Sequence, residues 1–382
     1  MILSKRSKID PFIVMDVMEA ARAAEAENRR IIHMEVGQPS TPAPLQARQA
    51  VVEALQRDPL GYTVALGLPD LRQGIARLYM QWYGVDLDPN RVVVTSGSSA
   101  GFLLAFTALF DPGARVGIAA PGYPSYRQIL KALSLQPVDI PTHAERSHQL
   151  RVEDVAVHPL DGLLVASPGN PTGTMLDKTA LKALVEHAEE RSIGFISDEI
   201  YHGIEYDKKA VTTLEVTDSA YVINSFSKYF SMTGWRVGWL VVPEDHVRSI
   251  ERLAQNMFIC PPHVSQIAAL AALDSGDEMT KNLAVYAENR RLMLVGLPQA
   301  GIAKIAPPDG AFYIYADISE FGVDSRTFAA EVLAEAGVAL TPGLDFDPLR
   351  GGQTIRMSYA QSTNEIVEGL RRLKAFMQAR FL

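Results

Sequence analysis

The segment from Ser225 to Gly238 brings three serines, a lysine and an arginine close together in the chain. It follows an apolar run at 221–223, which is typical of a short buried strand. A lysine amine such as that of Lys228, when burial or nearby cations keep it neutral, can attack a carbonyl and form a Schiff base. Serine hydroxyls and the paired N–H groups of Arg236 are suited to a phosphate. The segment therefore predicts imine chemistry beside a bound phosphate.

Two acidic residues, Asp198 and Glu199, directly follow an earlier apolar stretch at 193–197, which also predicts a strand. A carboxylate is costly to bury unless a cation or a proton donor meets it. A protonated ring nitrogen would be such a partner. Asp198 is the natural candidate for this contact, Glu199 is the rival carboxylate, and Tyr201 stands three residues after Asp198.

Other polar residues follow other predicted strands, where open α/β sheets bind their ligands. The turn Gly97-Ser98-Ser99 enters an apolar helix, whose N-terminus favours an anion, although Ser and Gly also serve as ordinary caps. Tyr123 follows a strand at 115–119 and could cover the face of a flat ligand or simply wedge the turn between two prolines. Asn170 stands in Asn-Pro-Thr-Gly after a strand at 163–166, a composition also expected of a plain turn.

Arg356 stands between apolar neighbours in a predicted strand at 353–358. An arginine is rarely buried without a partner. A substrate carboxylate is a suitable one, because a guanidinium can meet it with two parallel hydrogen bonds. A structural ion pair is the alternative.

Taken together, these motifs resemble the class I and II aminotransferases, the fold-type I enzymes that use pyridoxal 5′-phosphate (PLP). The most specific match is Ser-x-Ser-Lys at 225–228 followed by Gly-Trp-Arg-x-Gly at 234–238. Similar patterns occur as Tyr-x-x-x-x-Gly-x-x-x-Leu-Arg at 62–72, Asn-Pro-Thr-Gly at 170–173 and Asp-x-x-Tyr at 198–201. The resemblance spans nearly the whole chain, and its Asp-x-x-Tyr pattern favours Asp198 over Glu199.

The resemblance implies transfer of an amino group between an L-amino acid and a 2-oxo acid, through a Schiff base of Lys228 with PLP. It implies that Lys228 moves the Cα proton, that Asp198 pairs with the ring nitrogen, and that Tyr201 and Asn170 reach the phenolic oxygen. Gly37, Asn170 and Arg356 would hold the substrate. The other cofactor contacts that it implies are Tyr62 from a neighbouring subunit, the stacking residue Tyr123, and Gly97, Ser98, Ser99, Ser225, Ser227 and Arg236 at the phosphate.

The same resemblance implies an α/β protein of the fold-type I PLP-dependent transferases. It would have a seven-stranded, mostly parallel sheet in a large domain and a smaller α+β domain. The expected division is an N-terminal arm at 1–45 that contributes to the small domain, a large PLP-binding domain at 46–281, and a small domain at 282–382. A homodimer with shared active sites is also implied.

The period of the apolar residues predicts the elements that position these side chains. Helices are expected at 11–30, 45–57, 177–191, 244–257, 262–273, 277–297, 325–336 and 363–379, with further helices ending near 83, 110 and 133. Strands are expected at 31–37, 92–95, 115–119, 163–166, 193–197, 220–224, 237–242, 311–316 and 353–358. In the last hundred residues the succession of predicted strands and helices changes, which indicates an α+β layer.

Composition restricts the classes of partner. The 382 residues carry a formal net charge of −8 with both signs interleaved, which argues against nucleic acid or an anionic membrane as a partner. No apolar run approaches the length of a membrane span, and no metal-ligand spacing occurs. The single cysteine, Cys260, suits a reducing compartment, so we expect a cytoplasmic protein.

These motifs are also compatible with two other functions. A PLP-dependent C–S lyase on the same scaffold would share every cofactor residue. A PLP-fold sensing module of a transcription regulator is less favoured, because the family-like segment begins within the first few dozen residues and leaves no room for a DNA-binding domain. These motifs leave the amino donor open, and no segment predicts a second cationic side chain that would bind a distal carboxylate of the substrate.

Overall fold

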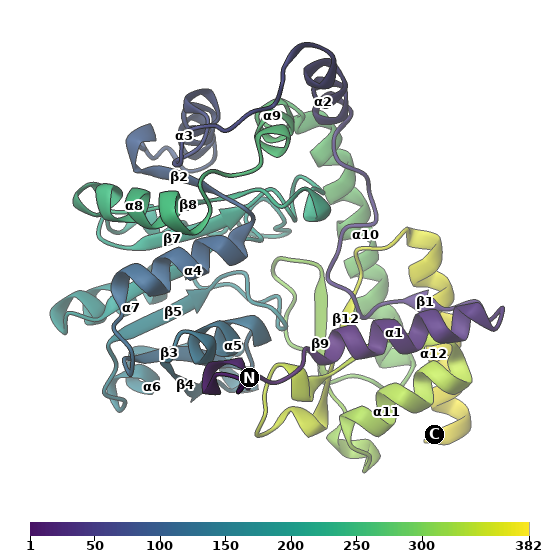
Figure 1. Cartoon of the computed structure of the whole chain (residues 1–382). Coiled ribbons are helices and arrows are strands. Elements are labelled where there is room, and N and C mark those ends of the chain that lie inside the picture. Colours follow the sequence, from purple (N-terminus) through teal and green to yellow (C-terminus); the bar gives the residue numbers. More distant parts are fainter. Residues whose placement is uncertain (382) are drawn as a thin grey trace.

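The computed structural model describes residues 1–381, and its largest element is a seven-stranded, mostly parallel sheet, as predicted (Figure 1). The strand order is β2-β8-β7-β6-β5-β3-β4, and only β8 runs antiparallel to its neighbours β2 and β7. The strands are β2 (Val92–Thr95), β3 (Arg115–Ala120), β4 (Gln136–Pro141), β5 (Gly162–Ala166), β6 (Gly194–Asp198), β7 (Tyr221–Ser225) and β8 (Gly238–Val241).

Helices cover both faces of this sheet, so strands such as β2, β5 and β8 are apolar along their length instead of alternating. Successive strand residues point to opposite faces. Val92 and Val94 of β2 therefore belong to one buried cluster with Leu71, whereas Val93 belongs to another with Phe102. The helices are α2 (Leu45–Arg57), α3 (Pro69–Tyr83), α4 (Ser98–Leu109), α5 (Pro124–Ala132), α6 (Val152–Ala156), α7 (Lys178–Glu190), α8 (Val247–Met257) and α9 (His263–Ala272).

A second, smaller layer contains the C-terminal part of the chain and part of the N-terminal segment (Figure 1). An antiparallel sheet has the order β11-β12-β9, and β1 pairs in parallel with β10. Its strands are β1 (Ile32–His33), β9 (Tyr313–Asp317), β10 (Val338–Ala339), β11 (Thr341–Pro342) and β12 (Thr354–Ser358). Its helices are α1 (Ile13–Ala26), α10 (Gly276–Gln299), α11 (Ser325–Glu331) and α12 (Thr363–Arg380).

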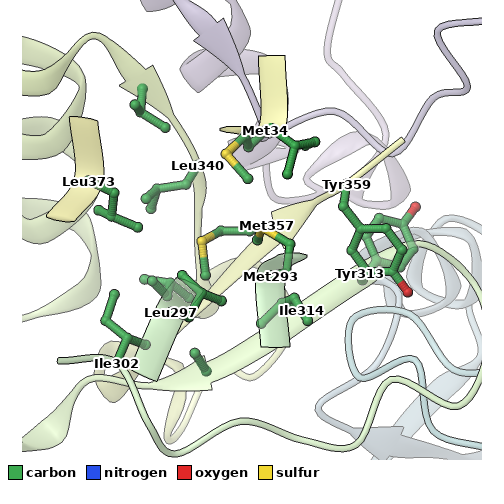
Figure 2. Close-up of a cluster of buried hydrophobic side chains, with 14 of the residues drawn as sticks. Met34, Met293, Leu297, Ile302, Tyr313, Ile314, Leu340, Met357, Tyr359 and Leu373 are labelled. Carbon is green, nitrogen blue, oxygen red and sulfur yellow. The ribbon is translucent and has the colours of Figure 1, made fainter. Parts of the chain in front are cut away.

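The core of the second layer joins both ends of the chain (Figure 2). Met34, just after β1, is buried in one cluster with Met293 and Leu297 of α10 and Leu373 of α12. This packing supports the assignment of the N-terminal arm to a small domain. The domain boundaries themselves stay a prediction.

The structure differs from the predicted elements in a few places. β4 was not expected, because Pro137 and Pro141 argue against a strand. They are tolerated here since β4 lies at the sheet edge and pairs only with β3. The predicted strand 31–37 is reduced to β1, whose partner β10 is equally short. The predicted helix 325–336 changes after α11 into a π-helical turn over Val332–Ala336.

Within residues 1–381, no helix is both long and apolar enough to cross a membrane. In the same range, no group of three or more His, Cys, Asp or Glu side chains is placed to hold a metal ion.

Candidate active site

A cavity of about 590 Å³ lies between the two layers. The large sheet contributes residues that follow β5, β6 and β7, because parallel strands bring their carboxyl ends to one edge. The smaller layer contributes Tyr313 of β9 and Arg356 of β12. The predicted site residues that line this cavity are Gly37, Ser98, Ser99, Tyr123, Asn170, Asp198, Tyr201, Ser227, Lys228, Arg236 and Arg356.

Lys228 follows β7 and projects its amine into the cavity. Its Nζ donates a hydrogen bond to the carbonyl oxygen of Gly37 at 2.6 Å. The pKa of Lys228 is lowered to about 8, mainly by burial and also by the cations Arg356 and Arg236, while the attraction of Asp198 opposes the shift. A larger fraction of the amine is therefore neutral at neutral pH than in an exposed lysine, which makes it a better nucleophile and base.

An anion cradle faces the lysine. The N-terminus of α4 places Ser98 and Ser99 at the cavity, where unpaired backbone N–H groups favour negative charge. Gly97 precedes this helix with a φ of 77°, and a Cβ there would lie 2.3 Å from the guanidinium of Arg236. Only glycine therefore lets Arg236 approach the helix N-terminus so closely.

Ser225 and Ser227 have different positions. Ser227 lines the cavity, whereas Ser225 is buried behind it and does not. The two hydroxyl oxygens lie 2.9 Å apart, and the Ser225 oxygen also accepts from the backbone N–H of Ser227 at 3.1 Å. The Ser225 hydroxyl therefore supports Ser227 in this structure, and its direct contact with a phosphate stays a prediction.

Asp198 ends β6 and is buried at the cavity wall. It accepts hydrogen bonds from the hydroxyl of Tyr126 and from the backbone N–H of Ile200. Burial raises the pKa of Asp198 to about 6, in spite of the Tyr126 bond that opposes the rise. The rival Glu199 turns away and accepts from Thr212 Oγ1 at 2.8 Å and from a backbone N–H at 2.8 Å.

The aromatic wall includes Tyr313, which the motifs did not indicate. Tyr201 lies with its hydroxyl 2.7 Å from that of Tyr313, and burial raises the pKa of both phenols. Tyr123 also lines the cavity and makes an edge contact with Tyr126. Tyr313 was missed because it comes from the other layer, and nothing local in its strand points to a ligand.

Arg356 is buried, and its partners leave part of the guanidinium unused. Its Nη1 donates to Asn170 Oδ1 at 3.0 Å, and its Nη2 donates to the carbonyl of Glu35. Its Nε has no hydrogen-bond partner. The planar group lies 4.6 Å from the ring centre of Tyr313. A buried donor without a partner costs free energy, so this guanidinium is suited to accept a further anionic ligand.

Gly37 is confined by the same wall. A Cβ added to it would lie 1.9 Å from the Tyr313 hydroxyl, so any side chain here would displace that tyrosine. Tyr62, in contrast, lies outside the cavity with 83% of its surface exposed. Within one chain, Tyr62 therefore makes no contribution to the site.

Together these groups form a site for a small anionic ring compound and a carboxylate. It contains an amine of lowered pKa, an anion cradle, a buried carboxylate without a cationic partner and a guanidinium with an unused donor. An N-terminal segment that includes Phe12, Val14 and Met15 adds apolar surface to the same cavity.

Comparison with known proteins gives consistent matches. Residues 29–373 match the family described as aminotransferase class I and II. The valine–pyruvate aminotransferase of Mycobacterium tuberculosis is 46% identical over 378 residues, which cover 97% of each chain. A protein of known structure from Silicibacter pomeroyi is 66% identical with a TM-score of 0.96, and both chains are covered completely. The structure of an aminotransferase from Mycobacterium tuberculosis is 45% identical with a TM-score of 0.97, covering 99% of this chain and 100% of that one.

Proposed function

The chain belongs to the class I and II aminotransferase family and is a PLP-dependent transaminase, and we propose that its amino donor carries an apolar side chain. The named relatives over the full chain are aminotransferases, so the C–S lyase and the sensing module are set aside. The roles of individual residues below are part of the proposal.

The residues of the cavity fit PLP. The cradle of Ser98, Ser99, Ser227 and Arg236 suits a phosphate, because it combines a helix N-terminus, hydroxyls and a guanidinium. Asp198 is a buried carboxylate that lacks a cationic hydrogen-bond partner, which a protonated ring nitrogen would supply. Both features are explained by a phosphorylated pyridine in this cavity.

Bound PLP supplies a carbonyl carbon that combines with primary amines and a protonated ring that withdraws electrons from the substrate. We assign the nucleophilic amine to Lys228 Nζ, which would also remove the Cα proton of the amino acid and deliver it to the cofactor carbon that receives the amino group. Burial supports this role, because it holds the pKa of Lys228 near 8 and keeps part of the amine neutral. Asp198 keeps a proton at the ring nitrogen, and Tyr123 covers the ring face.

Arg356 orients the amino acid through its α-carboxylate, with Gly37 and Asn170 beside it. The support is the buried Nε of Arg356 without a partner. Because Asn170 Oδ1 accepts from Arg356, the amide nitrogen of Asn170 stays available to donate to the cofactor oxygen or to the substrate. Tyr201 would form a hydrogen bond with the same cofactor oxygen, the phenolic oxygen of PLP. With its α-carboxylate at Arg356 and its amino group at the cofactor, the substrate has little rotational freedom left at Cα.

The class of donor rests on one observation: among the described residues that line the cavity, the cations are Lys228, Arg236 and Arg356. Each of them already has a role with the cofactor or the α-carboxylate. Within one chain, a second, distal carboxylate would therefore be buried without a cation, which is costly. Phe12, Val14 and Met15 offer apolar contact instead. The relative named valine–pyruvate aminotransferase agrees with an apolar donor and suggests pyruvate as the acceptor.

L-Leucine and L-aspartate test this proposal, because their side chains are similar in shape and differ in charge. With pyruvate as the acceptor, we expect kcat/KM to be at least about tenfold higher for L-leucine than for L-aspartate. L-Valine should resemble L-leucine. A higher kcat/KM with L-aspartate would overturn the apolar class, while leaving the transaminase assignment intact.

We further propose a homodimer in which each subunit completes the site of the other. Tyr62 lies in a surface hollow of about 480 Å³ with Cys260 and His263. Leu45 and Leu55 on α2 are also exposed, and exposed apolar side chains favour a protein partner. A cytoplasmic location is proposed as well, supported by the single cysteine, and cell fractionation would test it.

The dimer and the role of Tyr62 can be tested separately. Sedimentation velocity should give about twice the 41.8 kDa of one chain. Tyr62→Phe should weaken PLP retention about tenfold, because it removes a hydrogen bond to a charged phosphate. A monomer would reject the proposed assembly. A dimer in which Tyr62→Phe holds PLP as tightly as the parent would reject only the role of the tyrosine.

A further inference from the structure

The turn formed by residues 343–351 lies in the connection between β11 and β12 and contacts two parts of the substrate side of the cavity. The ring centre of Phe346 lies 4.7 Å from the guanidinium carbon of Arg356. The carboxylate of Asp345 accepts from the backbone N–H groups of Ile13 at 3.0 Å and Val14 at 3.2 Å. The position of this turn therefore affects both the carboxylate-binding arginine and the apolar N-terminal wall.

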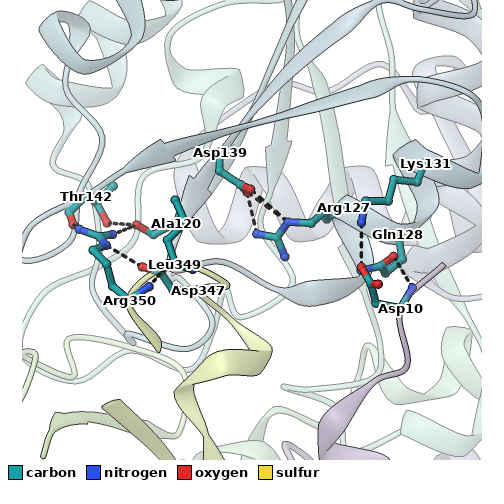
Figure 3. Close-up of polar contacts among 10 residues, drawn as sticks. All are labelled: Asp10, Ala120, Arg127, Gln128, Lys131, Asp139, Thr142, Asp347, Leu349 and Arg350. Carbon is teal, nitrogen blue, oxygen red and sulfur yellow. Dashed lines mark hydrogen bonds and ion pairs between the residues drawn. The ribbon is translucent and has the colours of Figure 1, made fainter. Parts of the chain in front are cut away.

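Arg350, at the end of this turn, attaches it to the large sheet (Figure 3). Its guanidinium donates to the carbonyl of Thr142 at 2.9 Å and to the carbonyl of Ala120 at 2.6 Å. Its Nε donates to Asp347 Oδ2 at 2.8 Å, and the Asp347 side chain is almost fully buried. The backbone adds one more link across the layers, from the N–H of Gly122 to the carbonyl of Phe346 at 3.0 Å.

The two carbonyls bound by Arg350 lie at the carboxyl ends of β3 and β4. Ala120 is the last residue of β3 and precedes the short turn that carries Tyr123 into the cavity. The Arg350 guanidinium therefore connects the start of the turn that carries Tyr123 to the turn 343–351, whose Phe346 contacts Arg356. A planar, always charged group with several donors can hold such a spacing, which a lysine ammonium cannot reproduce.

We propose that Arg350, paired with Asp347, is a positioning residue for substrate binding. It keeps turn 343–351 seated on the large sheet, so that Phe346 holds Arg356 in line with the α-carboxylate. This inference rests on the proposed role of Arg356. It assigns Arg350 no contact with PLP or with the reacting atoms.

The test uses the PLP-loaded enzyme and the variants Arg350→Gln and Asp347→Asn. We expect KM for L-leucine to rise about tenfold in each, with kcat changed less than about twofold. The absorbance of the bound cofactor and its retention should equal those of the parent. Asp347→Asn keeps an oxygen for the backbone N–H groups of Leu349 and Arg350, so it removes mainly the charge pair. The double variant should show less than the product of the two single effects, because both changes break one unit.

Arg372→Gln is the matched control. Arg372 likewise bonds a carboxylate of its own helix, Glu368 at 2.7 Å, and a backbone carbonyl of another segment, Arg30 at 2.8 Å. It does not line the cavity. The melting temperature of Arg372→Gln should fall about as far as that of Arg350→Gln, while its KM for L-leucine stays at the parental value. Arg350→Lys should recover only part of the lost affinity.

An unchanged KM in Arg350→Gln, or an equal rise in KM in Arg372→Gln, would overturn the inference. Arg356→Gln, measured in parallel, separates the two claims. If Arg356→Gln raises KM strongly while Arg350→Gln does not, only the positioning role fails. If Arg356→Gln leaves KM unchanged, the proposed carboxylate site fails, and the role of Arg350 fails with it.

Discussion

Replacing Lys228 by alanine is expected to lower kcat/KM for transamination by at least about 10⁴-fold. Among the described residues that line the cavity, Lys228 is the lone primary amine. The substitution removes both the proposed nucleophile and the proposed base for the Cα proton, and no neighbouring group in the cavity lining has a comparable amine. Formation of the 2-oxo acid from L-leucine, followed with pyruvate in excess, measures the loss.

Two further lysine variants make this result specific. Lys228→Arg keeps the positive charge, but its guanidinium stays protonated and should be as inactive as alanine. Lys304→Ala changes a surface lysine, 3.7 Å from Glu320, and should keep parental activity. Residual turnover by Lys228→Ala above about one hundredth of the parent would show that another group performs the proton transfer.

Asp198→Asn is expected to lower kcat about 10³-fold while leaving PLP bound. The amide preserves the size of the side chain and can still accept from Tyr126, but it has no charge to keep a proton at the ring nitrogen. The neighbouring carboxylate provides the control. Glu199→Gln alters a buried acid that bonds to Thr212 and Thr213, away from the cavity, and should lower stability much more than kcat.

The stability of the cofactor-free chain gives an independent readout for Asp198. Burial raises its pKa from 3.8 to about 6, so the folded chain binds this proton more tightly than the unfolded chain does. Its contribution to stability is therefore complete below pH 3.8 and lost as the pH rises through 6. Relative to the parent, cofactor-free Asp198→Asn should gain melting temperature at pH 8 and little at pH 4. An equal change at both values would contradict a buried, ionising carboxylate.

Much of the site followed from local patterns. The Ser-x-Ser-Lys segment, the acid that closes β6 and the turn after β5 are each recognisable because a strand end exposes a few residues to a ligand. The sheet itself followed from apolar runs, since strands buried on both faces are apolar throughout. β4 escaped detection because an edge strand tolerates the prolines that normally argue against strands.

Sequence alone therefore determined the enzyme family and predicted the groups of its chemistry: an amine, a carboxylate, a phosphate cradle and an arginine for a substrate carboxylate. The tertiary structure decided which groups support them. Tyr126 reaches Asp198, Tyr313 reaches Tyr201, and Ser225 lies behind Ser227, not in the cavity. Arg350 shows the reason most plainly, because it contacts Ala120 across 230 positions of the chain. Such contacts depend on how the two layers meet, and no local period or spacing records that.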